Sequence, residues 1–386
     1  MAWWTRQEFD SHPILGLAVL VLFCYLESSM GNFQEFRLHS EGVENLMKTY
    51  TEYVIPHGSG LLAAWVEIEM QNWWRRAYFG VPDFYRDCSV PLICPELEAI
   101  LTMANDQRAS VLWILCESHR LNTAAIVTCW DGRINQLMEI KSRSNHADVL
   151  EEAHPRKRLS QTDYVALMNA QAEKLDHWYA SLPPSDLPQH MGDQEIINPE
   201  GLAINALRFN SHNSAMNFAY YVAARVMQCI GPLHSLERAS AADIDQTYEE
   251  TETWVLLLLR VTAGISWKEC VRLNVYTIGL AGLLLGCALR SRSLATGLWI
   301  QNWLEERLNG NEFEEGNFPV FQILDALRLI NCERRNGRDV FSLFQTVNDG
   351  GGSGKFGSYH SQVINSLLVY GRCRATEEMY SYYASP

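Results

Sequence analysis

Three polar side chains recur at helical spacing in the middle of the sequence and could orient a ligand. Asn205, Arg208 and His212 are separated by three and by four residues, so on a helix they would share one face. The guanidinium group of Arg208 could then bind an anionic group of the ligand. The alternative interpretation is a polar helix face that pairs with neighbouring helices.

Two tryptophans, Trp299 and Trp303, lie one helical turn apart and form a second candidate site. Indole rings at this spacing can stack on a ligand. Apolar residues flank both rings, so packing in the core is the alternative interpretation. Together with Arg208 and His212, this pair makes up the ligand pocket that we expect, and we assign no catalytic residue.

The glycine-rich segment 348–358 resembles two catalytic motifs but satisfies neither. A P-loop needs Gly, four residues and then Gly-Lys-Ser/Thr. Here Phe356 follows Gly354 and Lys355, and Asp349 stands where the first glycine should be. A nucleophile elbow would need glycine at the position of Lys355, and a strand before it. We interpret the segment as a connector between helices.

The sequence predicts no metal site and no cofactor. None of the ten cysteines is separated from another by only two residues, so the spacing of zinc ribbons and redox pairs is missing. Most cysteines lie in apolar helical patterns, where a reduced, buried thiol is expected. His234 and Glu237 are interpreted as a surface pair or a helix start rather than half of a metal site. The acidic stretch 312–315 before Pro319 is interpreted as decoration of a helix start.

Helical periodicity dominates the chain. Apolar residues recur every three or four positions over 97–115, 215–226 and 320–327. Alternation of period two is short, and the best strand candidate, 125–128, is too isolated to build a sheet. We therefore predict an all-α fold, with a single large helical domain over 1–386.

Two apolar runs, 11–26 and 273–289, are shorter than the roughly 20 residues that span a bilayer. We predict that both are buried core helices and that the protein does not contact a membrane. The chain carries 31 basic and 45 acidic residues, a net charge of −14. Because a groove that follows phosphates needs clustered Lys and Arg, this balance is not typical of a nucleic-acid-binding protein.

Several short stretches share the pattern of one family. They are 22–27 with 36–39, 178–183, 206–209 leading to 220–225, 312–319 and 371–374. Together they resemble the regulatory (middle homology) region of fungal zinc-cluster transcription factors, known as the fungal-specific transcription factor domain. The resemblance covers residues 11–383 and depends on packing motifs, since no catalytic signature defines the family.

The resemblance implies transcriptional control, often of a secondary-metabolite gene cluster in a filamentous fungus. Members of the family normally begin with six cysteines that bind two zinc ions and read DNA. The Cys-x-x-Cys spacings of that cluster are missing here, so we expect no zinc-cluster domain and no direct DNA binding by this chain. The chain then acts through a partner, is a fragment of a longer regulator, or uses the scaffold differently.

Two functions follow as hypotheses. The leading one is a transcription-factor-like regulatory protein in the nucleus that acts through other transcription regulators and responds to a small-molecule effector. The alternative is an enzyme or binding protein for an apolar metabolite in a helical pocket, with the cytoplasm as the alternative location. The aromatic content favours the alternative. The lack of a recognisable catalytic pattern favours a protein without enzymatic activity.

The charge balance generates a first prediction. In a mobility-shift titration at near-physiological salt, the chain alone should bind duplex DNA only weakly and without sequence preference, because few basic groups can displace counterions. Addition of a partner regulator that carries a DNA-reading domain should produce the specific shift. Tight, sequence-dependent binding by the chain alone would show that a DNA-reading surface was missed.

Overall fold

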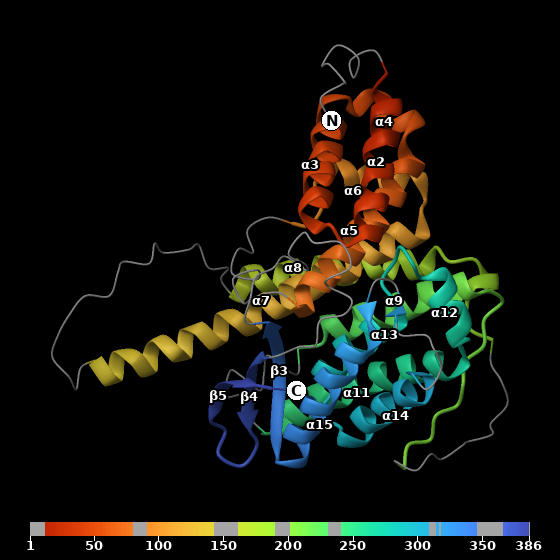
Figure 1. The fold of residues 1–386 in the computed structure, drawn as a ribbon. Coiled ribbons are helices and arrows are strands. Elements are labelled where there is room, and N and C mark those ends of the chain that lie inside the picture. Colours follow the sequence, from red (N-terminus) through yellow and green to blue (C-terminus); the bar gives the residue numbers. More distant parts are fainter. Residues whose placement is uncertain are drawn as a thin grey trace.

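The computed structural model of the chain describes residues 12–79, 91–142, 161–189, 201–230, 241–308, 314–315, 318–345 and 366–385. It is predominantly helical, which confirms the predicted all-α class (Figure 1). The helices are α2 (Pro13–Met30), α3 (Phe33–Thr49), α4 (Thr51–His57), α5 (Ser59–Phe79), α6 (Pro95–Ala104), α7 (Gln107–Ser142), α8 (Gln161–Ala180), the 3₁₀ turn η2 (Pro184–Asp186), α9 (His212–Gln228), α11 (Ala241–Gly264), α12 (Trp267–Leu273), α13 (Leu280–Arg290), α14 (Leu294–Leu308) and α15 (Val320–Arg335). The strands are β1 (Glu314–Glu315), β2 (Phe318–Pro319), β3 (Arg338–Gln345), β4 (Leu367–Cys373) and β5 (Met379–Ala384).

Helices α2 to α6 form a bundle at the N-terminal end of the described chain (Figure 1). The turn between α2 and α3 depends on Gly31, whose φ of +69° is in the left-handed region that glycine adopts without strain. The amides of Gly31 and Asn32 donate to the carbonyls of Ser28 and Glu27 at 3.1 and 2.9 Å. The side chain of Asn32 then caps the start of α3.

Helix α2 only partly fulfils the prediction of a buried core helix. Its inner face, with Leu17 and Cys24 fully buried, packs on α3 and α5. Its outer face exposes Leu15, Leu22 and Leu26 to solvent. By length and composition alone α2 could cross a membrane, and 39% of it is buried inside the protein.

Helix α7 is the long axis of the molecule and joins its two halves (Figure 1). Its 36 residues run beneath the N-terminal bundle, with α5, α8 and α9 packed along it. The isolated strand candidate 125–128 lies inside this helix. The β-branched residues there, Ile126 and Val127, are buried against neighbouring helices, and this packing outweighs their local strand propensity.

Helix α13 forms the centre of the second half. All of its eleven residues are buried, and α9, α11, α14 and α15 pack around it. The part of the apolar run 273–289 that begins at Leu280 is therefore a core helix, as predicted, whereas Leu273, Val275 and Tyr276 before it are exposed. A helix inside a protein cannot satisfy its terminal backbone groups with water, so its two ends need partners from the chain.

The N-terminus of α13 is capped by a buried carboxylate. The two side-chain oxygens of Glu315 accept the amides of Leu280 and Ala281 at 2.8 and 2.7 Å. Asn274 donates its side-chain amide to the same carboxylate at 2.8 Å. Gly279 permits this approach, since a Cβ there would lie 2.7 Å from the Glu315 carboxyl carbon. Residues 312–315 were interpreted as decoration of a helix start near Pro319; Glu315 is instead fully buried and caps α13, and residues 312 and 313 lie outside the described residues.

The C-terminus of α13 is capped by the buried guanidinium group of Arg334, and a second buried guanidinium group, that of Arg290, ties this end to its neighbours. Arg334 of α15 donates to the carbonyls of Ala288 and Ser291. Arg290 donates to the carbonyl of Phe341 in β3 at 3.1 Å and to the hydroxyl of Thr123 in α7 at 2.8 Å. A carboxylate at the N-terminus and guanidinium groups at the C-terminus are the charges that the dipole of α13 favours.

A three-stranded antiparallel sheet, in the order β3–β4–β5, was not expected from the sequence. In β3, Val340, Phe341, Leu343 and Phe344 are all buried, so both faces of the strand are apolar and the alternation that indicates a strand is missing. A register shift between Val340 and Ser342 disturbs the pattern further. β3 packs on α15 and extends the helical core.

The cap of α13 generates a second prediction. Glu315→Gln replaces one acceptor oxygen with an amide group, which leaves a buried backbone N–H without a partner. The free energy of unfolding should fall by about 1–3 kcal/mol, as measured by urea denaturation. Glu306→Gln, at a side chain that is 76% exposed on α14, is the matched control and should change it little. Equal effects of the two substitutions would contradict the assigned cap.

Candidate functional site

The predicted polar stripe does not form one helical face. Helix α9 begins at His212, because Ser211 adopts an extended conformation and its hydroxyl caps the Ser214 amide. Arg208 lies before the helix with an exposed side chain, and its carbonyl accepts the amide of Gln189 at 2.8 Å. The expectation that these residues share a helix is therefore wrong.

His212 belongs to the network beneath α13. Its Nε2 atom lies 2.9 Å from Oδ1 of Asn274, the side chain that donates to Glu315. Burial lowers the pKa of His212, so the imidazole is neutral near pH 7 and pairs with the amide. Through these contacts, His212 holds α9 against the turn that precedes α13.

Trp299 and Trp303 lie in an aromatic cluster of α12 and α14. Trp303 is 6% exposed and packs edge-on against Trp267, with ring centroids 5.6 Å apart. The guanidinium group of Arg307 stacks on the Trp303 ring, 3.6 Å from its centroid. These contacts are those of a packed cluster, and a ligand contact of the pair stays a prediction.

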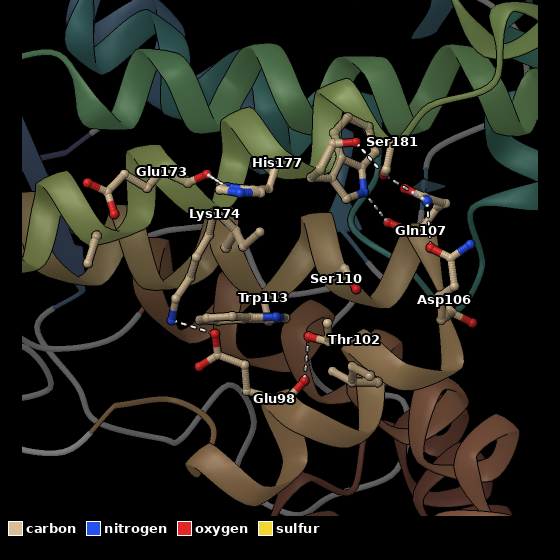
Figure 2. A pocket seen from close by; sticks show the side chains of 15 residues that line it. Glu98, Thr102, Asp106, Gln107, Ser110, Trp113, Glu173, Lys174, His177 and Ser181 are labelled. Atoms are coloured by element: carbon tan, nitrogen blue, oxygen red, sulfur yellow. Dashed lines mark hydrogen bonds and ion pairs between the residues drawn. The ribbon is translucent and has the colours of Figure 1, made fainter.

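A groove of about 510 Å³ lies elsewhere, between α6, α7 and α8 (Figure 2). None of the four predicted pocket residues lines it. The buried rings of Trp113 and Trp178 contribute to its lining, together with the acidic residues Glu98, Asp106 and Glu173 and the basic residue Lys174. Its volume is in the range of pockets that bind small molecules.

The local sequence builds the turn that forms one end of the groove. Asn105 ends α6 in the left-handed region with a φ of +50°, a conformation that Asn tolerates better than most residues. Asp106 then accepts the amide of Ala109 at 2.9 Å and caps α7. The indole N–H of Trp178 donates to the carbonyl of Gln107 at 2.8 Å, which fastens the last turn of α8 to this junction.

One wall of the groove holds an ammonium group of the chain itself. Nζ of Lys174 lies 2.6 Å from Oε1 of Glu98 and 4.6 Å from the centroid of the Trp113 ring. Figure 2 shows the lysine side chain reaching across from α8 to the ring and the carboxylate. A carboxylate and an aromatic face both attract a cation, so this wall is a cation-binding arrangement.

Sequence reasoning could not find this groove, because Glu98, Trp113 and Lys174 come from three different helices. Of its lining, the sequence analysis noted 97–115 only as a helical pattern and 178–183 only as a family motif. A local signal is the spacing of Lys174 and Trp178, four residues apart and so on one face of α8.

The chemistry of the described residues does not identify a reactive centre. No group of three or more His, Cys, Asp or Glu residues that could hold a metal ion occurs among them. The described cysteines are free, and burial raises the pKa of Cys24 and Cys229 to about 12. Such thiols are protonated at neutral pH and unreactive. The glycine segment 348–358 and the pair His234 and Glu237 lie outside the described residues.

Comparisons of the chain with family models, with curated proteins and with solved structures gave no match.

A buried acid behind the groove generates a third prediction. Burial raises the pKa of Glu67, on α5, to about 7; Arg108 opposes the rise and Asp106 adds to it. The folded protein therefore resists ionisation of Glu67, and this group lowers the stability as the pH rises from about 4.5 to about 7.

Glu67→Gln removes this penalty. The free energy of unfolding of the variant relative to the wild type should increase by up to about 3 kcal/mol between pH 4.5 and pH 7, and stay level above that. Denaturant titrations across this range measure the difference, with Glu41→Gln, at an exposed position of α3, as the control. A difference that does not vary with pH would contradict the raised pKa.

Proposed function

We propose that this chain is a regulatory protein of the transcription-factor type, located in the nucleus, which binds a small effector in the α6–α7–α8 groove. It acts through other transcription regulators that carry the DNA-reading domain. The observation that carries the proposal is the position of the groove, at the junction where α6 of the N-terminal bundle meets α7 and α8. The resemblance to fungal regulatory domains and the net charge of −14 support it.

A ligand in this groove would contact two parts of the molecule at once. α6 packs on α5 and α7, whereas α8 packs on α7 and α9, so the two walls of the groove belong to different sets of neighbours. A ligand that contacts both walls favours the arrangement of helices in which both contacts are made. Binding is then converted into a change at the surface that a partner recognises.

The composition of the groove argues against the alternative of an enclosed pocket for an apolar metabolite. Its lining includes three carboxylates and an ammonium group, and burying such charges beside a purely apolar ligand is unfavourable. An effector with polar or charged groups fits this lining better.

A reporter experiment tests the proposal. The chain is fused to an unrelated DNA-reading domain in a fungal strain that carries the matching reporter gene. The wild-type fusion should change reporter expression relative to the DNA-reading domain alone. Ala170→Trp, which places a large side chain in the groove lining, should abolish the response to the effector.

The matched control is Ala166→Trp, at an exposed position one turn earlier on α8 that does not line the groove. This variant should behave as the wild type does. Reporter expression equal to that of the DNA-reading domain alone, for the wild type and both variants, would contradict a regulatory role.

A further inference from the structure

The lining of the α6–α7–α8 groove indicates the chemistry of its ligand. We propose that the groove binds an organic dication, that is, an aliphatic diamine or polyamine. This inference rests on the proposed function in that it names the class of effector for the same groove.

The first argument is the charge of the lining. Three carboxylates, those of Glu98, Asp106 and Glu173, and one ammonium group, that of Lys174, line the groove. The Lys174 ammonium pairs with Glu98, whereas Asp106 and Glu173 lie toward opposite ends of the groove (Figure 2). His177 also lines the groove, and its ring nitrogen Nδ1 lies 2.9 Å from the carbonyl oxygen of Glu173. The carboxylates of Asp106 and Glu173 are not paired with a Lys or Arg side chain of the lining, and a dication matches these two charges.

The second argument is the way in which the chain already holds Lys174. The ammonium group sits between the Glu98 carboxylate and the Trp113 ring, at 2.6 and 4.6 Å. The methylene stem of the lysine lies along the same wall, so a primary amine on an aliphatic chain is the group that this wall accommodates (Figure 2). A diamine carries primary amines of this kind at both ends of an aliphatic chain, which would lie along the groove.

The third argument is the arrangement of apolar and polar groups. Leu101, Ile114 and Ala170 contribute apolar surface to the lining, which suits the methylene groups of a diamine. Carboxylates beside an apolar floor favour a ligand that donates hydrogen bonds at its ends.

Isothermal titration calorimetry of the full chain with a series of α,ω-diaminoalkanes tests the inference. Diamines of fitting length should bind, and the corresponding diols and dicarboxylates should not. Binding should weaken as the salt concentration rises, because salt screens the attraction between partly exposed charges. Asp106→Asn and Glu173→Gln should each weaken binding about two- to fivefold, the effect of one partly exposed charge.

Two variants make the result specific. Asp106→Asn keeps a good helix cap, so a loss of affinity there reports the charge rather than the fold. Lys174→Met removes the internal ammonium group and frees the Glu98 carboxylate, so it should strengthen diamine binding two- to fivefold. The control Glu41→Gln, exposed on α3, should leave the affinity unchanged.

The inference is overturned if no diamine binds to the wild type or to Lys174→Met, or if the diols bind equally well. It is also overturned if Glu41→Gln weakens binding as much as Glu173→Gln does. These outcomes are distinct from a failure of the proposed function. A reporter response that Ala170→Trp abolishes, without diamine binding, would leave the regulatory role intact and refute the dication. Diamine binding without any reporter response would support the dication and refute the regulatory role.

Discussion

The rest of the structure depends on one buried helix whose two ends are held by charges of the chain itself. α13 lies entirely in the interior, so its first amides and last carbonyls cannot reach water. Glu315 accepts hydrogen bonds from the first amides, and Arg334 donates hydrogen bonds to the last carbonyls.

Burial raises the pKa of Glu315, and the hydrogen bonds from Ala281, Asn274 and Leu280 oppose the rise. Burial likewise lowers the pKa of Arg334, to about 10. The helix dipole favours both charges where they lie.

Contacts that begin at α13 position the helices that form the groove. Arg290 ties α13 to α7 through Thr123, and the link from Glu315 through Asn274 to His212 ties it to α9. α9 in turn holds α8, because the rings of Tyr221 and Trp178 stack with centroids 5.8 Å apart. An ion pair between Arg225 and Asp176 joins the same two helices. α7 and α8, which form two walls of the groove, are thus anchored to the core through α9 and α13.

Local patterns in the sequence predicted the helical class, the burial of α13 and the burial of free thiols such as Cys116 and Cys287. They failed where a residue's role is set by a distant contact. Glu315 was interpreted as decoration of a helix start near Pro319, because nothing near it in the sequence shows that it reaches the start of α13. Strand β3 was hidden because both of its faces are buried.

The candidate site shows the same limit. Arg208 and His212 have helical spacing, yet a serine that caps the helix between them separates the two positions. Trp299 and Trp303 were correctly placed on one helix, where they join an aromatic cluster. The groove could not be predicted, because its lining comes from two separate segments, 98–114 and 170–181, which only the packing of α8 on α7 brings together.

The central claim is that a ligand in the groove joins the N-terminal bundle to the rest of the molecule. Hydrogen exchange followed by mass spectrometry, with and without a saturating α,ω-diamine, tests this most directly. The account predicts that exchange slows in α6 and in α8 together, while α15, on the far side of the core, is unaffected. Unchanged exchange in both α6 and α8, or protection confined to other helices, would contradict it.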